Sequence, residues 1–79
     1  MNWRDYIVST PDVIGGKPRV DGTRLGVAFL LGLFAAGWTQ EEVLENYPHL
    51  TEEALRAVFA FAAETAEAEM VYAVETKTS

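Results

Sequence analysis

The feature that most restricts the fold of this chain is an apolar run, VAFLLGLFAA, at residues 27–36. No residue in the run has a polar side chain, and Gly37 follows it, a residue type that commonly ends helices. We therefore predict a helix over 27–36. A helix that is hydrophobic on every side is normally buried on every side, and a single chain of 79 residues has too little protein to cover one. The run therefore predicts a homodimer.

Two more helices are expected after this run. Thr39 stands three residues before Glu42, which is the spacing of a capping box, and Pro48 ends the helix that Thr39 begins. Thr51 is a suitable cap for a third helix, whose apolar spacing continues to about Val74. Helix, short turn and helix form the outline of a helix-turn-helix.

Residues 1–26 carry strand and turn signals instead. The sequence YIVST at 6–10 is typical of a β-strand, and Gly15-Gly16 and Asp21-Gly22 are turn signals. Residues 19–20 and 23–25 are expected as short strand pieces around the second turn. We therefore predict a mainly α fold with an N-terminal strand and turn arm at 1–26, a three-helix helix-turn-helix domain at 27–74 and a frayed tail at 75–79.

Charge is distributed unevenly along the chain. The net charge is −6, which disfavours non-specific binding to nucleic acid or to an anionic membrane. Residues 1–24 nevertheless hold four basic residues against three aspartates, whereas residues 25–79 hold two against nine carboxylates. The uncharged run 25–40 is shorter than the roughly 20 residues that a membrane span needs, and no signal peptide is visible. We expect a cytoplasmic protein with no membrane partner.

The residues that usually carry chemistry are scarce. The chain has no cysteine, and His49 is its single histidine, so neither a thiolate site nor a histidine-based metal site or nucleophile–base pair is expected. Glu41, Glu42 and Glu45 have the spacing of a solvated helix face. We therefore predict no catalytic residues, no metal and no cofactor, and a protein that is not an enzyme.

Trp3 and Trp38 are expected in apolar contacts. Trp38 follows the predicted helix end at Gly37, where it would close the gap between the first two helices. Trp3 lies near the chain end, and we expect a partner chain to cover it.

The segments GGKPRVDGTRLGV and LLGLFAAGWTQEEVLENYPHLTEEALRAVFAFAA together resemble the domain of unknown function 433 family, whose members look like VapB-type antitoxins. The positions that match the family pattern are Gly15, Gly16, Pro18, Gly22, Thr23, Arg24, Ala36, Gly37, Trp38, Tyr47, Pro48, Leu50 and Thr51. The resemblance implies a homeodomain-like helix-turn-helix of three helices behind short strands. It also implies an antitoxin that binds a PIN-like ribonuclease toxin and its own operator DNA. Gly26 departs from the usual proline, and Ala28 and Phe29 depart from the polar residues usual there, which strengthens the prediction of a dimer.

The candidate nucleic-acid-binding residues are Lys17, Arg19, Arg24 and Arg56. Lys17 and Arg19 fit either phosphate contacts or solvated charges on a turn. For Arg24 we favour a structural role, in which it bonds the last carbonyls of a helix or pairs with an acid such as Glu42 or Glu45. At the start of the third helix Arg56 is the only donor beside two glutamates, which argues against strong DNA binding by one subunit.

The candidate partner-binding residues are Met70, Val71, Tyr72 and Val74, within the acidic segment ETAEAEMVYAVETKTS. An acidic segment with apolar anchors suits either a basic ribonuclease groove or a helix end that packs in the dimer. Two hypotheses for function remain: an antitoxin that binds a toxin ribonuclease and operator DNA, and a homodimeric protein-interaction module with no role on DNA.

Overall fold

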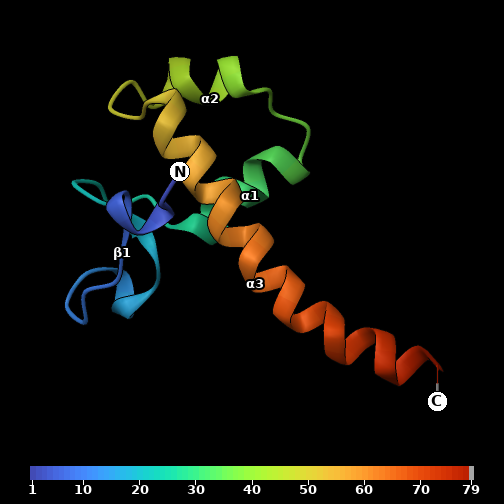
Figure 1. Cartoon of the computed structure of the whole chain (residues 1–79). Helices are drawn as coiled ribbons and strands as arrows, with labels where there is room; N and C mark the ends of the chain where they lie inside the picture. Colours follow the sequence, from blue (N-terminus) through green and yellow to red (C-terminus); the bar gives the residue numbers. More distant parts are fainter. Residues whose placement is uncertain (79) are drawn as a thin grey trace.

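A computed structural model describes the backbone of residues 1–78 and the side chains of residues 1–68. In chain order the elements are the 3-10 turn η1 (Trp3–Asp5), strand β1 (Ile7–Val8), the 3-10 turn η2 (Ile14–Gly16), strand β2 (Arg19–Val20), and helices α1 (Val27–Ala35), α2 (Gln40–Asn46) and α3 (Glu52–Thr78). Helix α3 runs through the molecule, and the other elements gather around its N-terminal half (Figure 1). The predicted fold of three helices behind short strands is confirmed.

The two strands form a minimal antiparallel sheet. Ile7 faces Val20 and Val8 faces Arg19, so the predicted strand at 6–10 is present but short. Residues 23–25 do not form a separate strand. They close a turn instead, in which the Val20 N–H donates to the Leu25 carbonyl at 3.0 Å and Gly22 has a positive φ of 81°. The arm is therefore a compact turn structure.

The helix ends follow the sequence signals. Gly37 has a φ of 100°, and the N–H groups of Gly37 and Trp38 donate to the carbonyls of Phe34 and Leu33, both at 3.0 Å. This is the Schellman arrangement that glycine permits after a helix. The Thr39 hydroxyl accepts from the Glu42 N–H at 3.1 Å while the Glu42 carboxylate accepts from the Thr39 N–H at 2.9 Å. The predicted glycine stop and capping box are both confirmed.

Helix α3 begins as predicted and ends later. The Thr51 hydroxyl accepts from the Ala54 N–H at 3.1 Å and so caps the first turn. The helix continues to Thr78, beyond the predicted end near Val74. Among the described residues, no helix combines the length and the apolar character that a membrane crossing requires.

The core lies where α3 meets α1, α2 and the arm. Its buried members are Ile7, Val20, Val27, Leu30, Val43, Leu50, Ala54, Leu55, Ala57 and Val58, and Trp38 packs half-buried against them. Trp3 lies edge-on against Phe61 of α3, with 4.8 Å between ring centroids, and its indole N–H donates to the Glu64 carboxylate. The expectation that a partner chain covers Trp3 is wrong, because α3 of the same chain folds back onto η1.

Candidate interaction surface

The first predicted cation, Arg19, is part of the interior. Its side chain is only 9% exposed, and its guanidinium donates to the Thr10 hydroxyl at 3.0 Å and to the Thr23 carbonyl at 3.3 Å. These two bonds tie the turn that follows β2 to the segment that follows β1. Arg19 therefore has a structural role within the arm, one that sequence analysis did not assign to it.

Lys17 and Arg24 are exposed and stand at the edge of a groove of about 720 Å³. The groove lies between the arm, the start of α1 and the middle of α3, and its apolar lining includes Ile14, Pro18, Ala28, Phe29, Phe61 and Ala62. Within the described side chains, Arg24 forms no ion pair with Glu42, Glu45 or any other carboxylate. The arm thus places the cations Lys17 and Arg24 beside a groove with an apolar lining.

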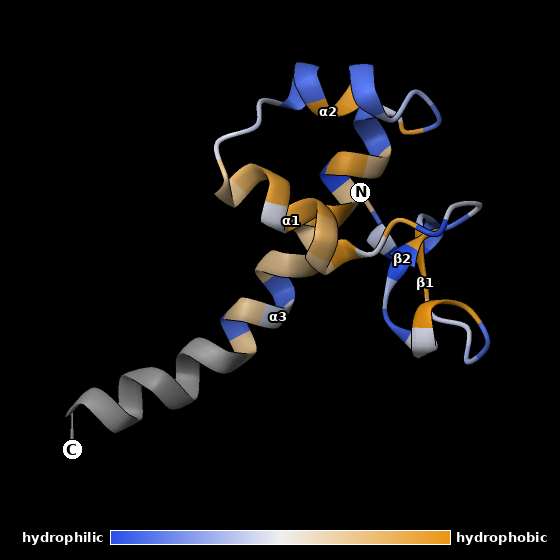
Figure 2. Ribbon diagram, turned by 180° about the vertical axis from the view of Figure 1, so that it is seen from behind, coloured by the Kyte–Doolittle hydropathy of each residue, from blue (hydrophilic) through white to orange (hydrophobic). Residues whose placement is uncertain are grey.

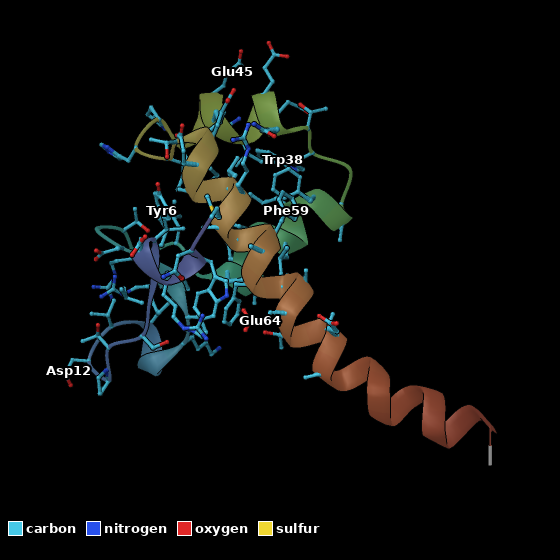
Figure 3. The ribbon with its side chains drawn as sticks, in the orientation of Figure 1. Tyr6, Asp12, Trp38, Glu45, Phe59 and Glu64 are labelled. Carbon is cyan, nitrogen blue, oxygen red and sulfur yellow. The ribbon has the colours of Figure 1, made fainter. Side chains whose placement is uncertain are left out.

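The outer face of the helix-turn-helix is acidic. Glu41, Glu42 and Glu45 of α2 are exposed, and Glu45 points away from the rest of the molecule (Figure 3). At the start of α3, Glu52 and Glu53 are exposed beside Arg56. His49 is exposed on the turn between the two helices. In this region Arg56 is the one arginine or lysine, so a phosphate backbone laid here would meet mainly carboxylates.

Helix α1 is apolar on both its buried and its exposed sides (Figure 2). Val27 and Leu30 face the core and are 4% and 0% exposed. The opposite face consists of Ala28, Phe29, Gly32, Ala35 and Ala36, all of which are exposed, and we call these residues the α1 outer face. Because water meets apolar side chains there, this face is a candidate interaction surface.

The C-terminal part of helix α3 projects beyond the other elements (Figure 1). Every side chain from Ala63 to Ala68 is exposed, and this stretch covers about one and a half helical turns, so side chains on all sides of the helix meet solvent. Glu64 is held by the Trp3 indole and by Arg4, whose guanidinium lies 3.8 Å from the carboxylate. The predicted partner-binding residues Met70, Val71, Tyr72 and Val74 lie outside the described side chains.

The described residues contain no group of three or more His, Cys, Asp or Glu side chains that can hold a metal ion. In the α2 cap, hydrogen bonds from the Thr39 backbone N–H and from its hydroxyl lower the pKa of Glu42. That interaction caps the N-terminus of α2. The surface features that invite a ligand are therefore the α1 outer face, the groove beside it and the projecting part of α3.

Three comparisons place the chain among known proteins. The family described as "Protein of unknown function (DUF433)" matches residues 7–62. An uncharacterised protein, y4eO of Sinorhizobium fredii (strain NBRC 101917 / NGR234), is 39% identical over 59 residues, which are 75% of this chain and 27% of that protein. The crystal structure of a DUF433 member from Anabaena variabilis superposes with a TM-score of 0.77 at 36% identity, over 81% of this chain and 63% of that one. The chain thus spans about a quarter of the first relative's length and under two thirds of the second's.

Proposed function

This chain belongs to the DUF433 family of proteins of unknown function, and from that premise we propose that it is an antitoxin-like binding protein. In this proposal it is not an enzyme, acts in the cytoplasm as a homodimer and sequesters a basic, PIN-like ribonuclease toxin. The antitoxin role comes from the family resemblance of the sequence motifs. The exposure and the charge of the projecting part of α3 support a binding role and indicate the chemistry of the partner.

The observation that carries the proposal is the projecting part of α3. A helix whose side chains are mostly exposed to water is marginal, because most helical stability in proteins comes from packing one face. The described stretch from Ala63 to Ala68 is exposed throughout, so a partner that packs against it would stabilise it. Stabilisation of an exposed segment by its partner is a common mode of binding.

The charge of the same segment selects a basic partner. Glu64 and Glu67 are exposed, and the sequence adds Glu69 and Glu75 against the single Lys77. Met70, Val71, Tyr72 and Val74 are the apolar anchors that we propose between these carboxylates. A ribonuclease binds a polyanion with basic residues, so an acidic helix can occupy the same groove and exclude RNA.

The test is co-purification with the product of the adjacent gene and relief of the growth arrest that this product causes. We expect the Glu67→Lys, Glu69→Lys double variant to bind at least roughly tenfold more weakly, because it reverses two charges of the acidic segment that we propose binds the basic groove. The matched control is Asp12→Lys, Glu45→Lys, which changes the net charge equally but lies away from the projecting helix (Figure 3). Absence of binding by the unaltered protein, or equal weakening by both variants, would contradict the proposal.

The proposal also includes binding to operator DNA, which needs a separate test. The cations available for phosphates are Lys17 and Arg24 on the arm and Arg56 on α3, since Arg19 is buried. We propose that DNA contact uses the two arms of a dimer together with the basic toxin. We expect a salt-dependent shift of the promoter fragment by the complex that is lost in the Lys17→Ala, Arg24→Ala, Arg56→Ala variant. No shift by the complex would leave the alternative, a homodimeric interaction module without a role on DNA. A shift that this variant retains would overturn the assignment of DNA contact to these three cations.

A further inference from the structure

Helix α1 contains a glycine that the single chain does not use. Gly32 lies in the interior of the helix, where glycine is the poorest helix former after proline. Its φ is not among the positive ones, and no described atom lies within 4 Å of the point where a Cβ would stand. Alanine would therefore fit and would favour the helix, so folding of the isolated chain gives no reason for glycine at this position.

The neighbours of Gly32 suggest a reason outside the chain. Ala28 and Ala36 lie four residues before and after it, so the three small residues form one row along the α1 outer face. Beside that row stands Phe29, which is 48% exposed. The Phe29 ring packs edge-on against Tyr47 at a centroid distance of 5.9 Å, which supports one of its edges. The α1 outer face thus carries a projecting aromatic side chain, Phe29, which we call the knob. One helical turn away it has a position without a side chain, Gly32, which we call the notch.

We propose that the α1 outer face is the homodimer interface, in which two α1 helices pack antiparallel and Phe29 of each copy sits over Gly32 of the other. This inference rests on the homodimer in the proposed function. A two-fold axis makes the same patch face itself, so a patch with both a knob and a notch can complement its own copy. In this packing the contacts come from the α1 outer face of each copy, and all five residues of that face are apolar.

Charge supports a second copy as the occupant. Two chains that each carry a net charge of −6 repel one another, so they must meet where carboxylates are absent. Residues 25–40 contain no charged residue, and α1 is the centre of that run. The α1 outer face also offers no charged group by which a different protein would be selected.

The size of an ordinary interface indicates how far the contact must extend. Such an interface takes about 800 Å² from each partner, which is roughly one seventh of the surface area of 5523 Å² that this chain exposes. Helix α1 alone is short, but Ala28 and Phe29 also line the groove beside it. The contact can therefore continue from the α1 outer face onto the apolar wall of the groove.

Sedimentation equilibrium of the full chain tests the interface directly. We expect a dimer for the unaltered protein, and a dissociation constant raised at least roughly tenfold in Gly32→Leu, because the added side chain occupies the place of the partner's Phe29. A Cβ at Gly32 meets no atom outside its own stretch of helix within the described residues. Phe29→Ala should raise the constant as well. The matched control is Ala63→Leu, which adds a similar volume to an exposed helical position of α3 and should leave the constant unchanged. Circular dichroism and thermal unfolding of dilute samples confirm that each variant folds.

The outcomes separate this inference from the proposed function. A Gly32→Leu protein that folds and dimerises as tightly as the unaltered one would overturn the α1 interface and leave the homodimer standing. A chain that stays monomeric at high micromolar concentration would overturn both the interface and the homodimer, whereas toxin binding by α3 is tested separately.

A cross-linking experiment tests the register. The chain has no cysteine, so Phe29→Cys and Gly32→Cys proteins can be prepared separately and mixed. The proposed packing brings these two positions together between copies, and the mixture should form an intermolecular disulfide faster than either protein alone. Equal rates in the mixture and in the separate proteins would overturn the antiparallel register.

Discussion

Helices α1 and α2 are neighbours in the chain, but they are stabilised in different ways. Helix α2 is capped by its own residues through the Thr39–Glu42 box, and it turns exposed glutamates to solvent. Helix α1 has no side-chain cap at Gly26, and its first N–H, on Val27, donates to the Pro18 carbonyl of the arm at 2.9 Å. Helix α2 is therefore capped and covered within the single chain, whereas α1 depends on the arm for its first hydrogen bond and leaves an apolar face exposed.

The difference shows which helix of this small fold leaves apolar surface uncovered. Local polar interactions complete α2, so nothing about it requires another molecule. Helix α1 is stabilised by burial of its inner face, and burial is the dominant favourable term in folding. Its outer face contributes none of that stabilisation until something covers it. The comparison therefore indicates α1 as the element that gains most from association.

The largest expected effect is loss of burial on the inner face of α1. Leu30 is 0% exposed, and Leu30→Ala should destabilise the protein by about 3 kcal/mol, because it removes apolar contacts and leaves a cavity. The matched control is Leu33→Ala in the same helix, where the leucine is half-buried and the loss should be about half as large. Urea unfolding at one protein concentration measures both. Equal losses would show that α1 is not anchored through one face.

The second effect concerns the arm on which the start of α1 depends. Arg19→Ala should destabilise the protein by about 2 kcal/mol, since it removes a buried stem and two hydrogen bonds, one to Thr10 after β1 and one to Thr23 in the turn before α1. Arg19→Met keeps much of the stem and should recover most of that loss. Thermal unfolding compares the two variants, and Lys17→Ala, on the exposed part of the arm, should change little. An Arg19→Met protein as unstable as Arg19→Ala would mean that the charge, and not the stem, holds the arm.

A smaller effect is expected from the cap of α2. Thr39→Ala removes the hydroxyl that accepts from the Glu42 N–H and should cost about 1 kcal/mol. Thr39→Ser keeps an accepting hydroxyl and should behave like the unaltered protein. Urea unfolding is the measurement. If Thr39→Ala were harmless, α2 would depend on tertiary packing as α1 does, and the contrast between the two helices would fail.

The smallest effect is a dependence on acid that belongs to the same cap. The backbone N–H and the hydroxyl of Thr39 lower the pKa of Glu42 in the folded state, so the ionised carboxylate contributes stability above its unfolded pKa. That contribution is lost as the pH falls through the lowered pKa. Glu42→Gln should therefore be less stable than the unaltered protein near neutral pH and should lose less stability on acidification. NMR titration of the Glu42 carboxyl checks the direction, and a raised pKa would contradict this account.

The cations of the arm show how far the sequence could predict the candidate site. The sequence places Lys17, Arg19 and Arg24 in one turn-rich segment, but it does not show which guanidinium is buried. The answer depends on Thr10, which lies nine residues before Arg19 and accepts its hydrogen bond across the arm. Trp3 is a similar case, because its contacts, Phe61 and Glu64, lie at the other end of the chain.

The starts of α2 and α3 with their threonine caps, and the glycine stop after α1, were determined by the sequence itself, because each depends on groups a few residues apart. The apolar composition of α1 was also plain in the sequence. Only the tertiary structure decided which face of α1 stays open, which arginine the arm buries and where α3 leaves the other elements. Those features depend on contacts between distant segments, and burial acts through such contacts without leaving a local pattern in the sequence.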